Sequence, residues 1–177
     1  MKVTLVRHGQ TEQNYAGNVQ GLENNFLNET GQRQCRKLRE KLKDEKFDIC
    51  FMSPLIRTVE TAMILIGDRV EMIPDKRLVE RDMGQLEGHA RSEYDAKKYW
   101  DYDLNCSDLD IEPVHSIFDR CSDFINYLKE NYGDKNILIV THASPVRALR
   151  HLLLNHELKG DLLDIVIDNC YCETIEV

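Results

Sequence analysis

Short apolar segments alternate with amphipathic segments along most of the chain, and this alternation constrains the fold more than any other feature. Apolar stretches with the length of buried strands lie at 2–7, 48–52, 70–73, 136–141, 163–167 and 171–176. Apolar residues at helical spacing lie at 28–44, 54–66, 114–130 and 145–154. The pattern predicts an α/β fold, a three-layer sandwich whose largely parallel central sheet has helices on both faces.

One segment interrupts the alternation. Residues 89–113 are polar, with Tyr94, Tyr99, Trp100 and Tyr102 placed among charged residues. A long irregular segment in a compact domain is often a functional lid. We therefore expect a short lid insertion here, in which 91–101 could form a short helix. No linker-like stretch divides the chain, so residues 1–177 are expected to form one domain.

The charge and the cysteine pattern exclude several classes of protein. The net charge is −8, and no long basic run offsets it, so we expect no nucleic-acid partner. No apolar run is long enough for a signal peptide or a membrane span. The six cysteines form no CxxC pair and show no zinc-type spacing. They indicate free thiols and a cytoplasmic location.

Polar residues suited to phosphate chemistry follow two of the predicted strands. Arg7, His8 and Gly9 end the first strand, and His142 follows the strand at 136–141. Ligands of parallel α/β sheets bind beyond the carboxyl ends of strands, so these residues can converge on one pocket. An arginine offers a two-pronged donor for phosphate oxygens. A histidine can act as a nucleophile near neutral pH.

Five short motifs accompany these residues, and their combination is specific. They are Arg7-His8-Gly9-Gln10-Thr11 with Asn14; Gln20-Gly21 with Leu27; Ser53-Pro54-Leu55 followed by Arg57-Thr58 and Thr61-Ala62; Leu78-Val79-Glu80 with Gly84 and Glu87-Gly88; and Val140-Thr141-His142. In this order they resemble the histidine phosphatase superfamily, also called the phosphoglycerate mutase-like family. The resemblance extends from the first strand to the helix after the last motif.

The resemblance implies a role for each matched residue. His8 resembles the nucleophile that becomes phosphohistidine, and Glu80 resembles the proton donor to the leaving group. Arg7, Arg57 and His142 resemble a phosphate clamp and complete the catalytic set. Substrate contacts are expected from Arg7, Asn14, Gln20, Gly21, Arg57, His142 and Ala143. Judged by residue type alone, Asn14 and Gln20 could also be turn residues.

The implied chemistry needs no metal and no cofactor. Phosphoryl transfer depends mainly on in-line positioning and on positive charge around the equatorial oxygens, which two arginines and a protonated His142 can supply. Attack requires that His8 be neutral, with its second ring N–H held by an acceptor. Glu80 must hold a proton in the first step and can then activate water as a base. A zinc site at His8 and His142 lacks a third ligand at a suitable spacing. The remaining histidines belong to no motif and are expected at the surface: His89, His115, His151 and His156.

Three departures from the family pattern leave these groups in place. Phe26-Leu27-Asn28 stands where Pro-Leu-Thr is usual, and asparagine caps a helix as well as threonine does. Ala143 replaces a glycine, so its methyl group can crowd a phosphate that meets its backbone N–H. Val114-His115-Ser116 lacks a carboxylate at the pocket edge.

Within this family the sequence favours a phosphomonoester hydrolase that acts on a small phosphorylated metabolite. A mutase must hold a bisphosphate, whereas 89–113 has three basic and seven acidic residues, a net charge of −4. The aromatic residues of this segment could stack on a ring in the leaving group, as in α-ribazole phosphate, or could anchor the lid on the core. A phosphoglycerate mutase, a phosphoprotein phosphatase and a non-catalytic phosphate-binding module are the alternatives. The oligomeric state is not predicted.

Overall fold

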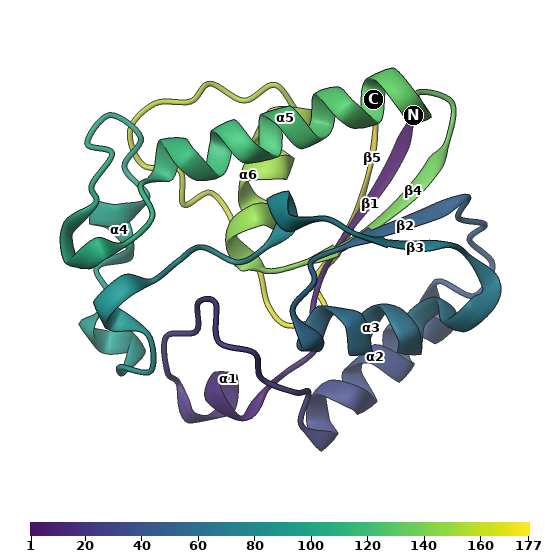
Figure 1. The fold of residues 1–177 in the computed structure, drawn as a ribbon, viewed down its shortest axis with the longest axis horizontal. Coiled ribbons are helices and arrows are strands. Elements are labelled where there is room, and N and C mark those ends of the chain that lie inside the picture. Colours follow the sequence, from purple (N-terminus) through teal and green to yellow (C-terminus); the bar gives the residue numbers. More distant parts are fainter.

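A five-stranded sheet forms the centre of the protein (Figure 1). The computed structural model describes residues 1–177. The strands follow the order β3-β2-β4-β1-β5, in which only β5 runs antiparallel to its neighbour. The largely parallel sheet is therefore confirmed. The strands are β1 (Lys2–Arg7), β2 (Ile49–Met52), β3 (Met72–Pro74), β4 (Asn136–Thr141) and β5 (Cys172–Glu176).

Helices cover both faces of this sheet, as Figure 1 shows. On one face lie α2 (Glu29–Lys41) and α3 (Ile56–Ile66), and on the other lie α5 (Val114–Tyr132) and α6 (Ala143–Leu153). Successive strand residues point to opposite faces. Ile139 accordingly packs in the core with α5 and α6, whereas Val140 packs in the core with α2 and α3. The predicted three-layer sandwich is confirmed.

Local sequence explains where the helices begin. The side chain of Asn28 accepts a hydrogen bond from the N–H of Gly31 at 2.8 Å, so it caps α2 as predicted. The third helix begins at Ile56 rather than at Pro54, because Leu55 keeps an extended backbone with φ −71° and ψ 138°.

A short helix after β1 is absent from the predicted elements. It is α1 (Glu12–Ala16), and its five residues are too few to show a hydrophobic period. A reciprocal capping box between Thr11 and Asn14 forms it instead. Such a box depends on side-chain hydrogen bonds rather than on apolar spacing.

The predicted strand at 163–167 is wrong. Its flanking carbonyl groups accept hydrogen bonds from side chains rather than from a neighbouring strand. Arg147 donates to the carbonyl oxygen of Leu162 at 3.3 Å, and Arg7 donates to that of Ile167 at 2.7 Å. The apolar residues of this stretch are still buried, with Leu162 and Ile167 in the core beside α5 and α6.

Residues 89–113 form a compact layer around a small core that they share with Val19, Met83 and Leu86. The N–H of Val19 donates to His89 at 2.8 Å, and the N–H of Arg91 donates to Gly17 at 2.9 Å, so this layer is tied to the segment after β1. Within the predicted helix at 91–101, only one α-helical turn forms. The elements are α4 (Ala96–Tyr99), η4 (Arg91–Glu93) and η5 (Asp108–Asp110), and the other 3-10 turns of the chain are η1 (Gly67–Arg69), η2 (Lys76–Leu78) and η3 (Gly84–Leu86). The small core contains Val19, Met83, Leu86, Tyr99, Cys106 and Ile111.

No helix of this chain combines the length and the apolar character that a bilayer crossing requires.

Candidate active site

A cavity of about 120 Å³ opens where β1 and β4 end. Six of the nine predicted site residues line it: Arg7, His8, Asn14, Gln20, Glu80 and Ala143. The other three, Gly21, Arg57 and His142, do not line it. The carboxyl ends of neighbouring parallel strands meet at one edge of the sheet, and this explains why residues far apart in sequence meet here.

His8 has the geometry that a nucleophile requires. It is 2% exposed, and its backbone N–H donates to Thr141 on the neighbouring strand at 2.9 Å. Its Nδ1 lies 2.7 Å from the carbonyl oxygen of Gly9, which can only accept, so Nδ1 carries the proton and Nε2 carries the lone pair. Burial, with the nearby charges of Arg7 and Arg57, lowers the pKa of His8 well below 6.5. The ring is therefore neutral near pH 7.

His142 is also neutral, which corrects the expectation that it is protonated. Its Nδ1 accepts a hydrogen bond from Nε of Arg57 at 3.2 Å, and its Nε2 donates to the hydroxyl of Ser53 at 2.8 Å. Burial, followed by the charge of Arg57, lowers the pKa of His142 well below 6.5. The rings of His142 and His8 lie edge to face, 5.2 Å apart.

Arg57 is fully buried, which excludes an ordinary surface arginine. Its Nη1 and Nη2 donate to the carbonyl oxygens of Glu23 at 2.6 Å and Gly21 at 2.8 Å. Burial lowers its pKa to about 10, so the guanidinium stays charged near pH 7. In this structure Arg57 thus braces the 21–23 segment and His142, and it does not reach the cavity directly.

Two N–H donors at the cavity have no partner. They are Nε of Arg7 and Nε2 of Gln20, and both atoms are buried. The oxygen of Gln20 accepts from the hydroxyl of Thr11 and from Asn14, each at 3.3 Å. Gln20 and Asn14 therefore belong to one hydrogen-bonded group at the cavity. A buried donor without an acceptor costs free energy, and a turn of either side chain toward a bound anion would remove that cost.

Glu80 lines the cavity and is 8% exposed, and its carboxylate meets the first N–H groups of α6. Its Oε1 accepts from the backbone N–H groups of Arg81 at 2.8 Å and Ser144 at 3.1 Å. Its Oε2 accepts from the N–H of Ala143 at 3.2 Å. The N–H of Ala143, expected to meet phosphate, is thus occupied by a carboxylate.

The structure adds cavity residues that the motifs do not indicate. Arg147 is one of them. It lies one turn into α6, and its guanidinium donates to Asp164 at 3.0 Å and to the backbone of 162–165. Nothing in its sequence position separates it from an ordinary helical arginine. The additional lining residues are Asn18, Val19, Met83, Arg91, Tyr94, Ala96, Trp100, Ser144, Arg147 and Leu163.

The aromatic residues of 89–113 lie partly at the cavity and partly against the core. Tyr94 and Trp100 line the cavity, so they can contact a ligand. Tyr94 also stacks on buried Tyr99, with ring centroids 5.4 Å apart. Tyr102 lies outside the cavity lining and packs on His115, with ring centroids 4.3 Å apart. His115 is therefore only half-buried rather than free at the surface.

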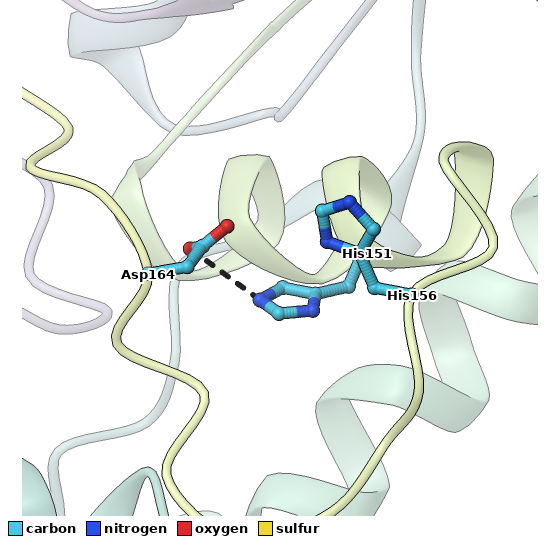
Figure 2. A group of neighbouring side chains, drawn as sticks. All are labelled: His151, His156 and Asp164. Atoms are coloured by element: carbon cyan, nitrogen blue, oxygen red, sulfur yellow. Dashed lines mark ion pairs between the residues drawn. The ribbon is translucent and has the colours of Figure 1, made fainter.

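A second cluster of ligand-type side chains lies away from the cavity. Figure 2 shows His151, His156 and Asp164 together, with an ion pair of 3.4 Å between His151 and Asp164. His151 is 4% exposed, so its expected surface position is wrong. Both carboxylate oxygens of Asp164 are already paired with guanidinium groups, those of Arg147 and Arg150. These two positive charges disfavour a cation at the same oxygens, and we place no metal there.

Comparison with known proteins agrees with this geometry. The histidine phosphatase superfamily (branch 1) matches residues 3–177. The chain is 34% identical over 148 residues to the uncharacterized phosphatase PhoE of Bacillus subtilis, covering 83% of this chain and 74% of that protein. It is 29% identical over 165 residues to phosphoserine phosphatase 1 of Hydrogenobacter thermophilus, covering 89% of this chain and 78% of that protein.

A solved structure gives the same assignment. Phosphoserine phosphatase from Entamoeba histolytica, in complex with 3-phosphoglyceric acid, superposes with a TM-score of 0.81 and 25% identity. The match covers 98% of this chain and 89% of that chain. The predicted family is confirmed: the chain belongs to the histidine phosphatase superfamily, branch 1, and is an enzyme of the phosphatase class.

Proposed function

We propose that the chain hydrolyses phosphomonoesters of small metabolites through a phosphohistidine at His8, without a metal. The main support is the set of unpartnered groups at one cavity: Nε2 of His8, Nε of Arg7 and Nε2 of Gln20. A phosphoryl group bound among them would meet a nucleophile and two N–H donors. Donors held in place before the reaction stabilise the charge that develops during it.

In the first half-reaction, Nε2 of His8 attacks phosphorus while its Nδ1–H stays bonded to the carbonyl oxygen of Gly9. The bond between phosphorus and the ester oxygen breaks as the new P–N bond forms. Arg7 balances the charge on the phosphoryl oxygens. Arg57 contributes positive potential through His142, and it contacts phosphate only if it releases a backbone carbonyl.

Glu80 is the proposed acid and then the proposed base. The first half-reaction requires Glu80 to hold a proton beside the bound phosphate. The proton goes to the leaving oxygen, which prevents release of an alkoxide. Once the alcohol has left, the N–H groups of Arg81, Ala143 and Ser144 stabilise the carboxylate again. Glu80 can then take a proton from the water that attacks phosphohistidine.

Arg91 supports a substrate with a second anionic group. It lies at the cavity, it is exposed, and it forms no ion pair with the protein. A small carboxylated phosphate ester could place its phosphate at His8 and its carboxylate at Arg91. Phosphoserine is the first substrate to test, since two of the similar proteins are phosphoserine phosphatases.

The proposal is tested by phosphate release from p-nitrophenyl phosphate and phosphoserine in EDTA, with wild type, His8→Ala and His89→Ala. His89 is a matched control because its side chain is half exposed and outside the cavity lining. We expect turnover in wild type and His89→Ala, loss in His8→Ala, and competitive inhibition by vanadate. Abolition of wild-type activity by EDTA would contradict the metal-free mechanism.

The same assay separates the alternatives. A mutase would exchange phosphate between phosphoglycerate isomers in a bisphosphate-dependent reaction and would release little free phosphate. If the chain is a phosphate-binding module, wild type would bind orthophosphate and the Arg7→Ala variant would lose that binding. Neither protein would release phosphate from any ester tested.

A further inference from the structure

Two of the six cysteines meet beside the proposed nucleophile. Cys35 on α2 and Cys170 just before β5 are 135 positions apart, yet their sulfur atoms lie 3.6 Å apart. We propose that Cys35 and Cys170 form a reversible disulfide under peroxide and that this bond slows the phosphatase by displacing the loop that holds His8. The inference goes beyond the proposed hydrolysis, because it concerns how the site is controlled.

The loop is residues 167–171, and it is bonded to the site backbone. The N–H of Cys170 donates to the carbonyl oxygen of His8 at 3.2 Å. Asn169 donates to the same oxygen at 3.2 Å and to the side chain of Asn14 at 3.0 Å. A movement of this loop at Cys170 therefore changes its hydrogen bonds to His8 and, through Asn169, to Asn14.

Cys35 contacts the same site segment at Gly9. It is fully buried, and its thiol donates to the hydroxyl of Thr61 at 3.6 Å. That hydroxyl accepts from the N–H of Gly9 at 3.1 Å. A Cβ on Gly9 would lie 2.8 Å from the Cys35 sulfur, so sulfur and backbone are in close contact. Both thiols thus lie beside the backbone of residues 8–9.

The surroundings favour a thiolate at Cys35 more than at Cys50 or Cys121. Burial raises the pKa of Cys50 and Cys121 to about 12. The pKa of Cys35 is instead lowered, first by the hydrogen bond from Cys170, whose own pKa is raised by the same bond and by burial. Cys170 is partly exposed and lies near the guanidinium of Arg7, so an oxidant can reach the pair in an electropositive setting.

The oxidation balances with hydrogen peroxide as the two-electron acceptor. The thiolate of Cys35 attacks one peroxide oxygen, an S–O bond forms, the O–O bond breaks, and the released hydroxide takes the proton of Cys170 to give water. The thiolate of Cys170 then attacks the Cys35 sulfur, an S–S bond forms, and the sulfenic oxygen leaves as hydroxide, which takes a proton to give a second water.

Bond formation must move the loop. A disulfide has a sulfur–sulfur distance of about 2.05 Å, so the two atoms must approach by roughly 1.5 Å from their present separation. Cys35 belongs to a 13-residue helix, whereas Cys170 has a left-handed φ of 58° in an irregular loop. We therefore expect the loop to move rather than the helix. Its hydrogen bonds to His8 and Asn14 would then be distorted.

The test compares wild type with Cys35→Ser, Cys170→Ser and the matched control Cys172→Ser. Each protein is treated with hydrogen peroxide, alkylated, and digested without reduction. Mass spectrometry should find the Cys35 and Cys170 peptides linked in wild type and in Cys172→Ser, with two fewer free thiols. This readout does not require enzyme activity, so it remains informative if the proposed function is wrong.

Activity is measured on the same samples, each against its own untreated protein. We expect kcat of wild type and Cys172→Ser to fall at least about tenfold and to recover in dithiothreitol, since a displacement of about 1 Å can cost that much. Cys35→Ser and Cys170→Ser should keep their untreated rate. A Cys170–Cys172 bond, no loss of thiols, or a linked pair with unchanged kcat would each overturn the proposal.

Discussion

At the scale of single residues, burial determines the protonation of the site. His8 and His142 are both neutral because desolvation and neighbouring arginines disfavour the imidazolium form. For His8 this leaves a lone pair on Nε2. For His142 it means that positive charge comes from Arg57 behind it, through the 3.2 Å hydrogen bond. Glu80 is then the group suited to exchange a proton with the substrate.

Replacement of Glu80 by glutamine should separate its acid role from its structural role. Glutamine keeps one oxygen, which can accept from Arg81 and Ser144, but it loses the acceptor for the N–H of Ala143 and cannot transfer the proton. We expect kcat for phosphoserine to fall about a hundredfold or more, with a smaller effect on hydrolysis of p-nitrophenyl phosphate, whose leaving group needs no proton. Glu130→Gln, on the exposed side of α5, is the control. Equal losses on both substrates would argue against acid catalysis.

The low pKa of His8 also predicts how stability depends on pH. The folded protein keeps His8 neutral below 6.5, whereas the unfolded chain binds a proton near that ordinary value. The unfolded state therefore binds more protons between the folded and unfolded pKa values, and the free energy of unfolding falls as pH falls below about 6.5. The contribution of His8 is fully present above that pH.

Urea unfolding of wild type and His8→Asn between about pH 7.5 and pH 5 tests this. Wild type should lose stability more steeply than the variant, by up to about 1.4 kcal/mol per pH unit. Parallel curves for the two proteins would show that His8 keeps an ordinary pKa in the folded state.

At the scale of secondary structure elements, the approach of α2 to the segment after β1 positions His8. A Cβ at Gly31 would lie only 2.1 Å from the carbonyl oxygen of Gln10, and a Cβ at Gly9 would lie 2.7 Å from the carbonyl oxygen of Gly31. Two glycines thus allow backbone to meet backbone where a side chain would not fit. The Asn28 cap then sets where α2 begins.

Gly31→Ala should therefore destabilise the protein by about 3 kcal/mol, because neither backbone can yield without moving the other. It should also lower kcat, since Gln10 follows the site segment directly. Gly133→Ala is the matched control: its Cβ would lie 3.1 Å from the Lys129 carbonyl oxygen, and its φ of −61° suits alanine. Denaturant unfolding of both variants gives the comparison, and similar stabilities would contradict the close approach.

At the scale of the whole molecule, Trp100 joins the 89–113 layer to the sheet and its helices. It is 5% exposed, and its ring centroid lies 5.4 Å from the guanidinium carbon of Arg81 and 5.2 Å from that of Arg147. Arg147 belongs to α6, and Arg81 follows Glu80, so one side chain links three parts of the cavity wall. Cation–π contacts of this buried kind are worth about 2 kcal/mol.

Trp100→Ala should loosen this layer. We expect a loss of about 3–5 kcal/mol in unfolding free energy and a higher KM, with a smaller change in kcat because His8 and Glu80 do not contact the indole. Trp100→Phe, which keeps an aromatic face for both arginines, should recover most of the stability. Urea unfolding and steady-state kinetics of wild type and both variants measure these effects. An unchanged KM in Trp100→Ala would show that the 89–113 layer does not contribute to substrate binding.

Sequence alone determined the layers, most element boundaries, and the family. Strand and helix periods are local, so they predict β1, β4, α2 and α5 closely. The motif residues at strand ends also predict which side chains meet, because parallel strands bring their carboxyl ends together. The strand predicted at 163–167 is wrong for a physical reason. An apolar run shows that residues are buried, but not that their backbone pairs with another strand.

Tertiary structure alone decided the connections between distant side chains. The hydrogen bonds of Arg57 to the 21–23 backbone, the neutral state of His142, and the contact of Cys35 with Cys170 each depend on segments that are remote in sequence. No periodicity encodes such contacts, since they arise only once the sheet has set the strand order. Their energies depend on burial, which the folded molecule determines as a whole.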